Sequence, residues 1–124
     1  MLTPAISAAV EKLRGTVLAD EVEVVVVLPV GGSAQVVARG TADRVTVRPP
    51  QVLRYVMMSG ATAYVLVHTH PAGGPPSAAD RAVTRRLVTA SAFVGLRLLA
   101  HVVVTPTELY DCAADTIVRD LRAG

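Results

Sequence analysis

Three segments carry apolar side chains every three to four residues, which is the period of an amphipathic helix. Residues 3–15 and 49–60 each have a proline at the first helical positions and a glycine at the end. Residues 77–95 begin at Ser77, a residue type that caps helices, and also end at a glycine. A shorter fourth helix is expected at about residues 113–121.

The segments between these helices are rich in β-branched residues and predict strands. Residues 21–28 read EVEVVVVL, and after a Gly-Gly turn residues 35–40 read QVVARG, which indicates a β-hairpin. Residues 63–70 (AYVLVHTH) and 96–105 (LRLLAHVVVT) are apolar runs typical of strands covered on both faces. The sequence therefore predicts an α/β (α+β) domain with a mixed, largely antiparallel sheet flanked by helices.

The composition fits one cytoplasmic domain. A chain of 124 residues that is 52% hydrophobic can build a single core. Its net charge of +2, spread without a basic block, does not indicate nucleic-acid binding. The single cysteine, Cys112, excludes an internal disulfide and a Cys-rich zinc site. The longest apolar run, Val24 to Val30, is far shorter than the roughly 20 residues that span a bilayer, so we expect no membrane partner.

The candidate chemistry lies at the end of the third expected strand. His68 and His70 are two residues apart, so on a strand they share a face and can share a metal ion. Asp80 follows ten residues later, after a Pro- and Gly-rich loop that can return the next helix to the strand end. Three such ligands leave a position for water, as in catalytic zinc sites; manganese and iron fit the ligand types less well.

Each part of this pattern also has an ordinary structural interpretation. A His-x-His pair alone is more often two hydrogen-bonded histidines than a metal site. Ser77 and Asp80 have the spacing of a capping box, although a capping serine can still present its hydroxyl to a site. His101 lies within an apolar strand and is expected to be a core histidine or one that supports a ligand. A nucleophilic pair of Cys112 and His101 has no supporting motif.

Read together, residues 68–80 (HTHPAGGPPSAAD) resemble the JAMM (MPN-plus) metalloprotease signature, which combines His-x-His, Ser and Asp with an upstream Glu. The continuation TRRLVTASAFVGLRLLAHVVVT resembles the bacterial RadC family, and the match extends from about Glu21 to Thr105. Two features differ from the family pattern. The loop from His70 to Ser77 is one residue shorter than the usual JAMM spacing, and Ala100 replaces an Asp before the strand histidine.

The resemblance implies a JAB/MPN (cytidine-deaminase-like) α-β-α sandwich with one zinc ion per chain. The matching positions are His68, His70 and Asp80 as zinc ligands and Ser77 as the serine that stabilises an oxyanion. Alignment of the EVEVVVVL strand through Leu28 puts Glu21 in the place of the general base, and Glu23, on the same face, is the alternative.

The function implied by the resemblance is that of a zinc-dependent hydrolase, a metallopeptidase or isopeptidase. Its substrate would be a peptide or a ubiquitin-like protein conjugate. Residues 1–124 are expected to be a single RadC-like JAB/MPN domain without the N-terminal helix-hairpin-helix segment of full-length RadC proteins. The sequence leaves the substrate and the oligomeric state open.

Two other functions remain open. The first is a nucleic-acid-binding module associated with DNA repair, in which Arg81, Arg85 and Arg86 on an exposed helix face contact phosphates. The second is a non-catalytic MPN interaction domain. Because all the ligand types are present, the hydrolase is the preferred interpretation.

Overall fold

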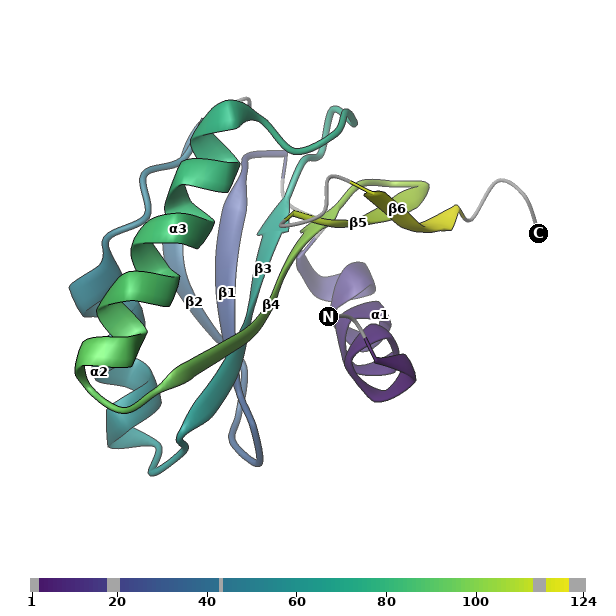
Figure 1. The fold of residues 1–124 in the computed structure, drawn as a ribbon. Coiled ribbons are helices and arrows are strands. Elements are labelled where there is room, and N and C mark those ends of the chain that lie inside the picture. Colours follow the sequence, from purple (N-terminus) through teal and green to yellow (C-terminus); the bar gives the residue numbers. More distant parts are fainter. Residues whose placement is uncertain (1–2, 18–20, 43, 113–115, 121–124) are drawn as a thin grey trace.

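The computed structural model describes residues 3–17, 21–42, 44–112 and 116–120. Helices and strands alternate along most of this chain, and the last part consists of strands (Figure 1). The elements are α1 (Pro4–Val17), β1 (Val24–Pro29), β2 (Gln35–Arg39), α2 (Pro49–Met58), β3 (Ala63–Thr69), α3 (Ala78–Phe93), β4 (Arg97–Val104), β5 (Glu108–Asp111) and β6 (Thr116–Asp120).

The strands form one sheet in the order β2-β1-β3-β4-β5-β6. Only the β3–β4 pair among these is parallel, because α3 connects the two strands and returns the chain to the same edge. Helix α1 covers one face of the sheet, and α2 and α3 cover the other (Figure 1). The predicted fold class, a mixed and largely antiparallel sheet between helices, is confirmed.

The core is divided between the two faces of the sheet, as the period-two geometry of strands requires. Val24 and Val26 pack in a cluster with Val10 of α1. Val25 and Val27 point the other way and pack in the cluster beneath α2 and α3. This two-sided burial explains why the sequence of β1 is a continuous apolar run rather than an alternating one.

The same alternation determines which side chains meet where β1 begins and β3 ends. Leu66 packs beneath α2 and α3 whereas Val67 packs on the α1 face, so His68 lies on the face of Leu66. In the antiparallel pairing with β1, His68 lies opposite Val25. The start of β1 therefore meets the end of β3, and Glu23, two residues before Val25, lies on the same face as His68.

The prediction of a C-terminal helix at residues 113–121 is wrong. The structure has β5 paired with β4, and β6 (Thr116–Asp120) paired with β5; residues 113–115 and 121 lie outside the described residues. The physical reason is the open edge of each preceding strand: the backbone groups of β4 find partners in β5, and those of β5 find partners in β6. The β-branched Thr116, Ile117 and Val118 also favour a strand over a helix. In the described part of the chain, no helix is both long enough and apolar enough to cross a bilayer.

Gly40 lies in a tight turn after β2, and substituting it tests whether that turn needs a residue without a side chain. A Cβ atom at this position would lie 1.8 Å from the carbonyl oxygen of Arg44, which also accepts a hydrogen bond from the Thr41 amide at 2.7 Å. We expect Gly40→Ala to lower the free energy of unfolding by about 1–3 kcal/mol in urea denaturation, because the turn must open.

The control is Gly15→Ala in α1, where a Cβ atom would meet nothing within 4 Å. This change should instead raise the free energy of unfolding by roughly 0.5–1 kcal/mol through helix propensity. Equal stability of the Gly40→Ala variant and the unchanged protein would contradict the role assigned to the turn.

Candidate metal centre

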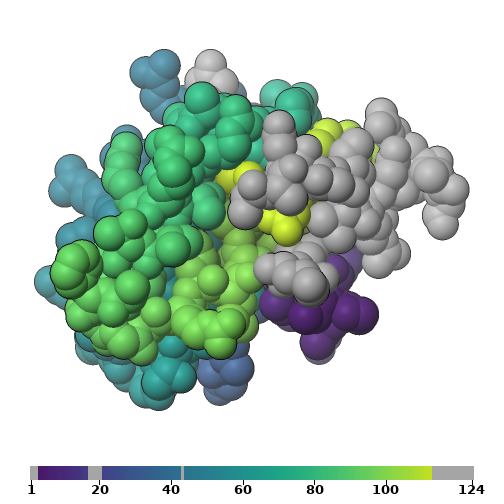
Figure 2. Space-filling view, viewed as in Figure 1, coloured from purple at the N-terminus to yellow at the C-terminus, as the bar shows by residue number. Residues whose placement is uncertain are grey.

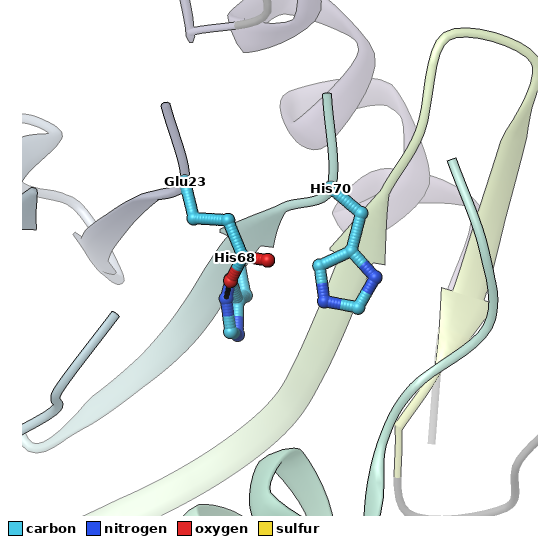
Figure 3. Close-up of side chains that lie close together, drawn as sticks. All are labelled: Glu23, His68 and His70. Atoms are coloured by element: carbon cyan, nitrogen blue, oxygen red, sulfur yellow. Dashed lines mark hydrogen bonds and ion pairs between the residues drawn. The ribbon is translucent and has the colours of Figure 1, made fainter. Parts of the chain in front are cut away.

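Glu23, His68 and His70 come together where β1 begins and β3 ends (Figure 3). All three are buried, with exposed fractions of 7%, 3% and 9%. One ligand atom from each residue lies within 4.8 Å of the other two. Backbone hydrogen bonds hold Glu23 in place: its amide donates to Thr41 and its carbonyl accepts from Gly40. These side chains form a group that can hold a metal ion.

Asp80, at the start of α3, contacts both histidines. Its Oδ1 lies 3.0 Å from Nδ1 of His68, and its Oδ2 lies 3.2 Å from Nε2 of His70. Ligand atoms around a tetrahedral zinc with bonds of about 2.0–2.1 Å are separated by about 3.3 Å. The two observed separations are close to this value, so the structure brings together His68, His70 and Asp80, the three ligands proposed from the sequence.

The capping box predicted at the start of α3 is present and belongs to the same site. The Ser77 amide donates to Asp80 Oδ2 at 2.7 Å, and the Asp80 amide donates to Ser77 Oγ at 3.1 Å. The Asp80 carboxylate therefore caps the helix and faces the histidines at the same time. The loop that is one residue shorter than the usual spacing still returns Asp80 to the end of β3.

Each histidine has one ring nitrogen engaged by an acceptor. His68 Nε2 lies 2.7 Å from Glu23 Oε1, and His70 Nδ1 lies 3.2 Å from the carbonyl oxygen of Gly74. When the rings are neutral, these nitrogens carry the protons and donate, as in the carboxylate–histidine arrangement of metal sites. The other nitrogen of each ring then has a bare lone pair, and this nitrogen lies 3.0 Å (His68) or 3.2 Å (His70) from an oxygen of Asp80.

These bare nitrogens provide the test of whether a metal fits. His68 Nδ1 is buried and has no hydrogen-bond partner among the described residues, although Asp80 Oδ1 is only 3.0 Å away. Two acceptors at this distance repel each other unless a proton or a metal ion lies between them. The donor set of two imidazole nitrogens and a carboxylate oxygen suits zinc. The donor chemistry therefore fits a cation: Glu23, His68 and His70 have ligand atoms close together, and Asp80 contacts both histidines.

The electrostatics of Asp80 favour the charged carboxylate. Burial alone would raise its pKa. In the metal-free site, His68 and His70 rings that carry protons on the nitrogens facing Asp80, together with the Ser77 amide, lower the pKa far below its ordinary value. For His70, burial lowers the pKa, yet the Asp80 contact and the Gly74 carbonyl outweigh it and leave the pKa raised. Because a metal ligand must be deprotonated, protons and metal compete for this histidine.

The acidic residue that lies in the site is Glu23, not Glu21. Glu21 is exposed in a bend before β1, whereas Glu23 lies against His68. The sequence placed Glu21 there through alignment of the strand and kept Glu23 as the alternative. The pairing of Val25 with His68 decides between them, because it puts the residue two positions before Val25 at the end of β3.

The site opens into a pocket of about 260 Å³. Its lining consists of Glu23, Arg44, Val45, His68, His70, Ser77, Ala79 and Asp80. Sequence reasoning did not identify Arg44 and Val45, which reach the pocket through the turn at Gly40. Ser77 therefore lines the same opening as the proposed metal ligands.

His101 and Cys112 lie behind the site rather than in it. His101 is 1% exposed, and its ring is parallel to that of His68 with centroids 6.1 Å apart. Burial lowers the pKa of His101 to about 3, with a further contribution from the charge of His68. Burial raises the pKa of the Cys112 thiol to about 11, so the thiol stays protonated at neutral pH. This chemistry does not support a Cys112/His101 nucleophile.

The chain belongs to the RadC-like JAB domain family: residues 7–116 match the sequence profile of that family. The match includes both strands and the helix that form the site, and it confirms the family suggested by the HTHPAGGPPSAAD motif.

Similar proteins from several bacteria carry the name UPF0758 protein. The chain is 47% identical over 66 residues to one from Xanthomonas campestris pv. campestris. These aligned residues cover 52% of this chain and 29% of the relative. It is 48% identical over 67 residues to one from Thioalkalivibrio sulfidiphilus, and the alignment covers 53% of this chain and 30% of that relative. For the relative from Vibrio cholerae the identity is 46% over 67 residues, covering 53% and 42%. The matched part therefore spans less than half of each of these relatives.

The depressed pKa of His101 predicts how stability depends on pH. Its pKa of about 3 in the folded protein lies below the ordinary 6.5, so the unfolded chain binds a proton that the folded protein excludes. The resulting stability is fully present above about pH 6.5 and is lost as the pH falls toward 3, with a slope of at most about 1.4 kcal/mol per pH unit.

A His101→Asn variant lacks this titration. In metal-free protein, urea unfolding between pH 6.5 and 4 should show a steeper loss of stability for the unchanged protein than for the variant. His70 is common to both proteins, so its opposite contribution cancels in the difference. Parallel curves for the two proteins would show that His101 is not held neutral by the fold.

Proposed function

We propose that this chain is a zinc-dependent hydrolase of the JAMM type that cleaves a peptide or isopeptide bond. The observation that carries the proposal is the buried carboxylate of Asp80, which faces a ring nitrogen of His68 and of His70 at 3.0 and 3.2 Å. Membership of the RadC-like JAB family supports the same reaction class. Fold alone would not select a reaction, so the argument rests on the side chains of the site.

In this proposal His68, His70 and Asp80 hold one zinc ion. A bound zinc lowers the pKa of a coordinated water to about 7 and polarises the carbonyl group to be attacked. The carboxylate of Asp80 is already charged in the fold, which meets the requirement for a ligand. The Gly74 carbonyl fixes the ring of His70, and Glu23 fixes the ring of His68.

Glu23 is the proposed proton acceptor. One carboxylate oxygen is in contact with His68 Nε2, which fixes the direction of the group. A Glu23 oxygen also lies within 4.8 Å of one ring nitrogen of each histidine, so the carboxylate faces the same small volume as the two rings and would be placed to take a proton there. The carboxylate can therefore orient His68 and still accept a proton from the attacking water.

Ser77 is the proposed donor to the oxygen that becomes negatively charged during attack. Its Oγ accepts the hydrogen bond from the Asp80 amide, which uses a lone pair and leaves the hydroxyl proton free. Ser77 also lines the pocket. One such donor contributes roughly 3–4 kcal/mol to transition-state stabilisation in other hydrolases.

The shape of the pocket suggests the form of the substrate. A volume of about 260 Å³ accommodates a short extended segment rather than a folded surface. We therefore expect cleavage at an exposed tail or at an isopeptide-linked side chain. A ubiquitin-like protein would enter through its extended C-terminal segment.

The pair Glu23→Gln and Glu21→Gln tests the role of the acid. Glutamine keeps an oxygen that can accept from His68 Nε2 but cannot take a proton, so Glu23→Gln should retain zinc. Hydrolysis of quenched fluorescent peptide and isopeptide substrates should fall by about 10²–10⁴-fold. Glu21→Gln, which changes the same charge at an exposed position, should leave both zinc content and turnover unchanged. Full activity of Glu23→Gln, or loss in Glu21→Gln, would refute the assignment.

A second candidate function rests on the outer side of α3, which lies open at the surface (Figure 2). Arg85, Arg86 and Phe93 line a shallow hollow there, and Phe93 is 86% exposed. Guanidinium groups bind phosphates, and an exposed aromatic ring can stack on a base. These residues support the alternative of a nucleic-acid-binding module. Arg81 is less available, because it is half-buried and donates to the Pro76 carbonyl.

Binding of a fluorescent single-stranded oligonucleotide tests this second function. If α3 binds nucleic acid, Phe93→Ala should weaken binding by about 1–3 kcal/mol, and Arg86→Ala should reduce the dependence of binding on salt. Arg54→Ala, an exposed change of equal charge on α2, is the control. Absence of binding at low salt would eliminate this function.

A further inference from the structure

His101 is a buried group for which the proposed reaction has no chemical use. It lies on β4, is 1% exposed, and stacks parallel to the ring of His68 with an angle of 6° between the planes. Its Nδ1 lies 2.7 Å from Oγ1 of Thr84 on α3. The imidazole therefore fills the space between a proposed metal ligand and the helix that carries another.

The hydrogen bonds of Thr84 determine which nitrogen of His101 carries the proton. The hydroxyl has one hydrogen, and the carbonyl oxygen of Asp80, 3.2 Å away, can only accept. If the hydroxyl donates to the Asp80 carbonyl and accepts from His101 Nδ1, Thr84 satisfies both partners at once. A hydroxyl that donates to His101, or to Cys112 Sγ at 3.6 Å, leaves the Asp80 carbonyl without this donor. The first arrangement leaves His101 Nε2 as a bare nitrogen, and this atom has no partner among the described residues.

Thr84 thereby connects three elements behind the site. It is one helical turn after Asp80, and it contacts both His101 of β4 and the sulfur of Cys112, which follows β5, at 3.6 Å. The Cys112 amide also donates to the His101 carbonyl at 2.8 Å. The second turn of α3 is thus fixed to β4, the strand beside β3.

We propose that Thr84 and His101 are positioning residues of the metal centre. The bond between them locks α3 to β4 one turn behind Asp80, and the His101 ring supports the ring of His68. Together they hold Asp80 and His68 at the separation that one cation requires. This inference rests on metal binding by the site, as in the proposed function, but concerns residues that do not contact the metal or the substrate.

The matched pair Thr84→Val and Thr84→Ser tests the inference. Valine keeps the shape of threonine and removes the hydroxyl, whereas serine keeps the hydroxyl and removes a methyl group. Zinc affinity, measured by competition with a chelator, should fall by about 10–100-fold in Thr84→Val. Thr84→Ser should retain most of the affinity. The visible spectrum of cobalt-loaded protein should change only in the valine variant, because it reports ligand geometry.

A double-mutant cycle with His101→Phe separates positioning from general stability. Phenylalanine keeps a ring beneath His68 but cannot bond to Thr84, so its loss of zinc affinity should match that of Thr84→Val. The double variant should lose little more than either single variant. A purely structural role would lower the unfolding temperature of the metal-free protein and leave zinc affinity unchanged.

Three results would overturn the inference. If Thr84→Val binds zinc as tightly as Thr84→Ser, or if the losses in the double variant simply add, Thr84 and His101 do not act together on the site. In both cases the proposed function stands, because the unchanged protein binds zinc. If the unchanged protein binds no zinc, the proposed function and this inference fail together.

Discussion

The carboxylate of Asp80 is the group on which the site depends. It caps the first turn of α3 through Ser77 and faces both imidazoles at the end of β3. A buried carboxylate without such partners would cost several kcal/mol, so its neighbours also explain why it is tolerated at 4% exposure. Because the capping geometry fixes Asp80 on the helix, the return of α3 to the sheet and the formation of the metal centre are one structural event.

The chemistry of the site was predictable from the sequence where local rules determine it. Prolines and glycines mark the ends of α2 and α3, and the period of two places His68 and His70 on the same face of β3. The Ser77–Asp80 spacing predicted a cap, which is present, and the same carboxylate lies against both histidines, where a ligand was expected. The JAMM resemblance then joined these parts, and the family assignment is confirmed.

The parts that the sequence did not predict depend on contacts between distant segments. Strand β5 forms along the unpaired edge of β4, and β6 (Thr116–Asp120) pairs in turn with β5; neither edge is a feature of the local sequence. The choice between Glu21 and Glu23 depends on the register of β1 against β3. The sequence cannot make this choice, because residues two apart on a strand lie on the same face. Likewise, no motif joins Thr84 to His101, which meet only because α3 packs on β4.

The central claim is that two histidines and one carboxylate bind the same zinc ion. X-ray absorption at the zinc edge, on protein loaded with one equivalent of zinc, tests it most directly. Zinc held by His68, His70 and Asp80 should give nitrogen and oxygen neighbours at about 2.0–2.2 Å, outer-shell scattering from two imidazoles, and no sulfur. Failure to retain zinc, a sulfur ligand at about 2.3 Å, or scattering from a single imidazole would contradict it.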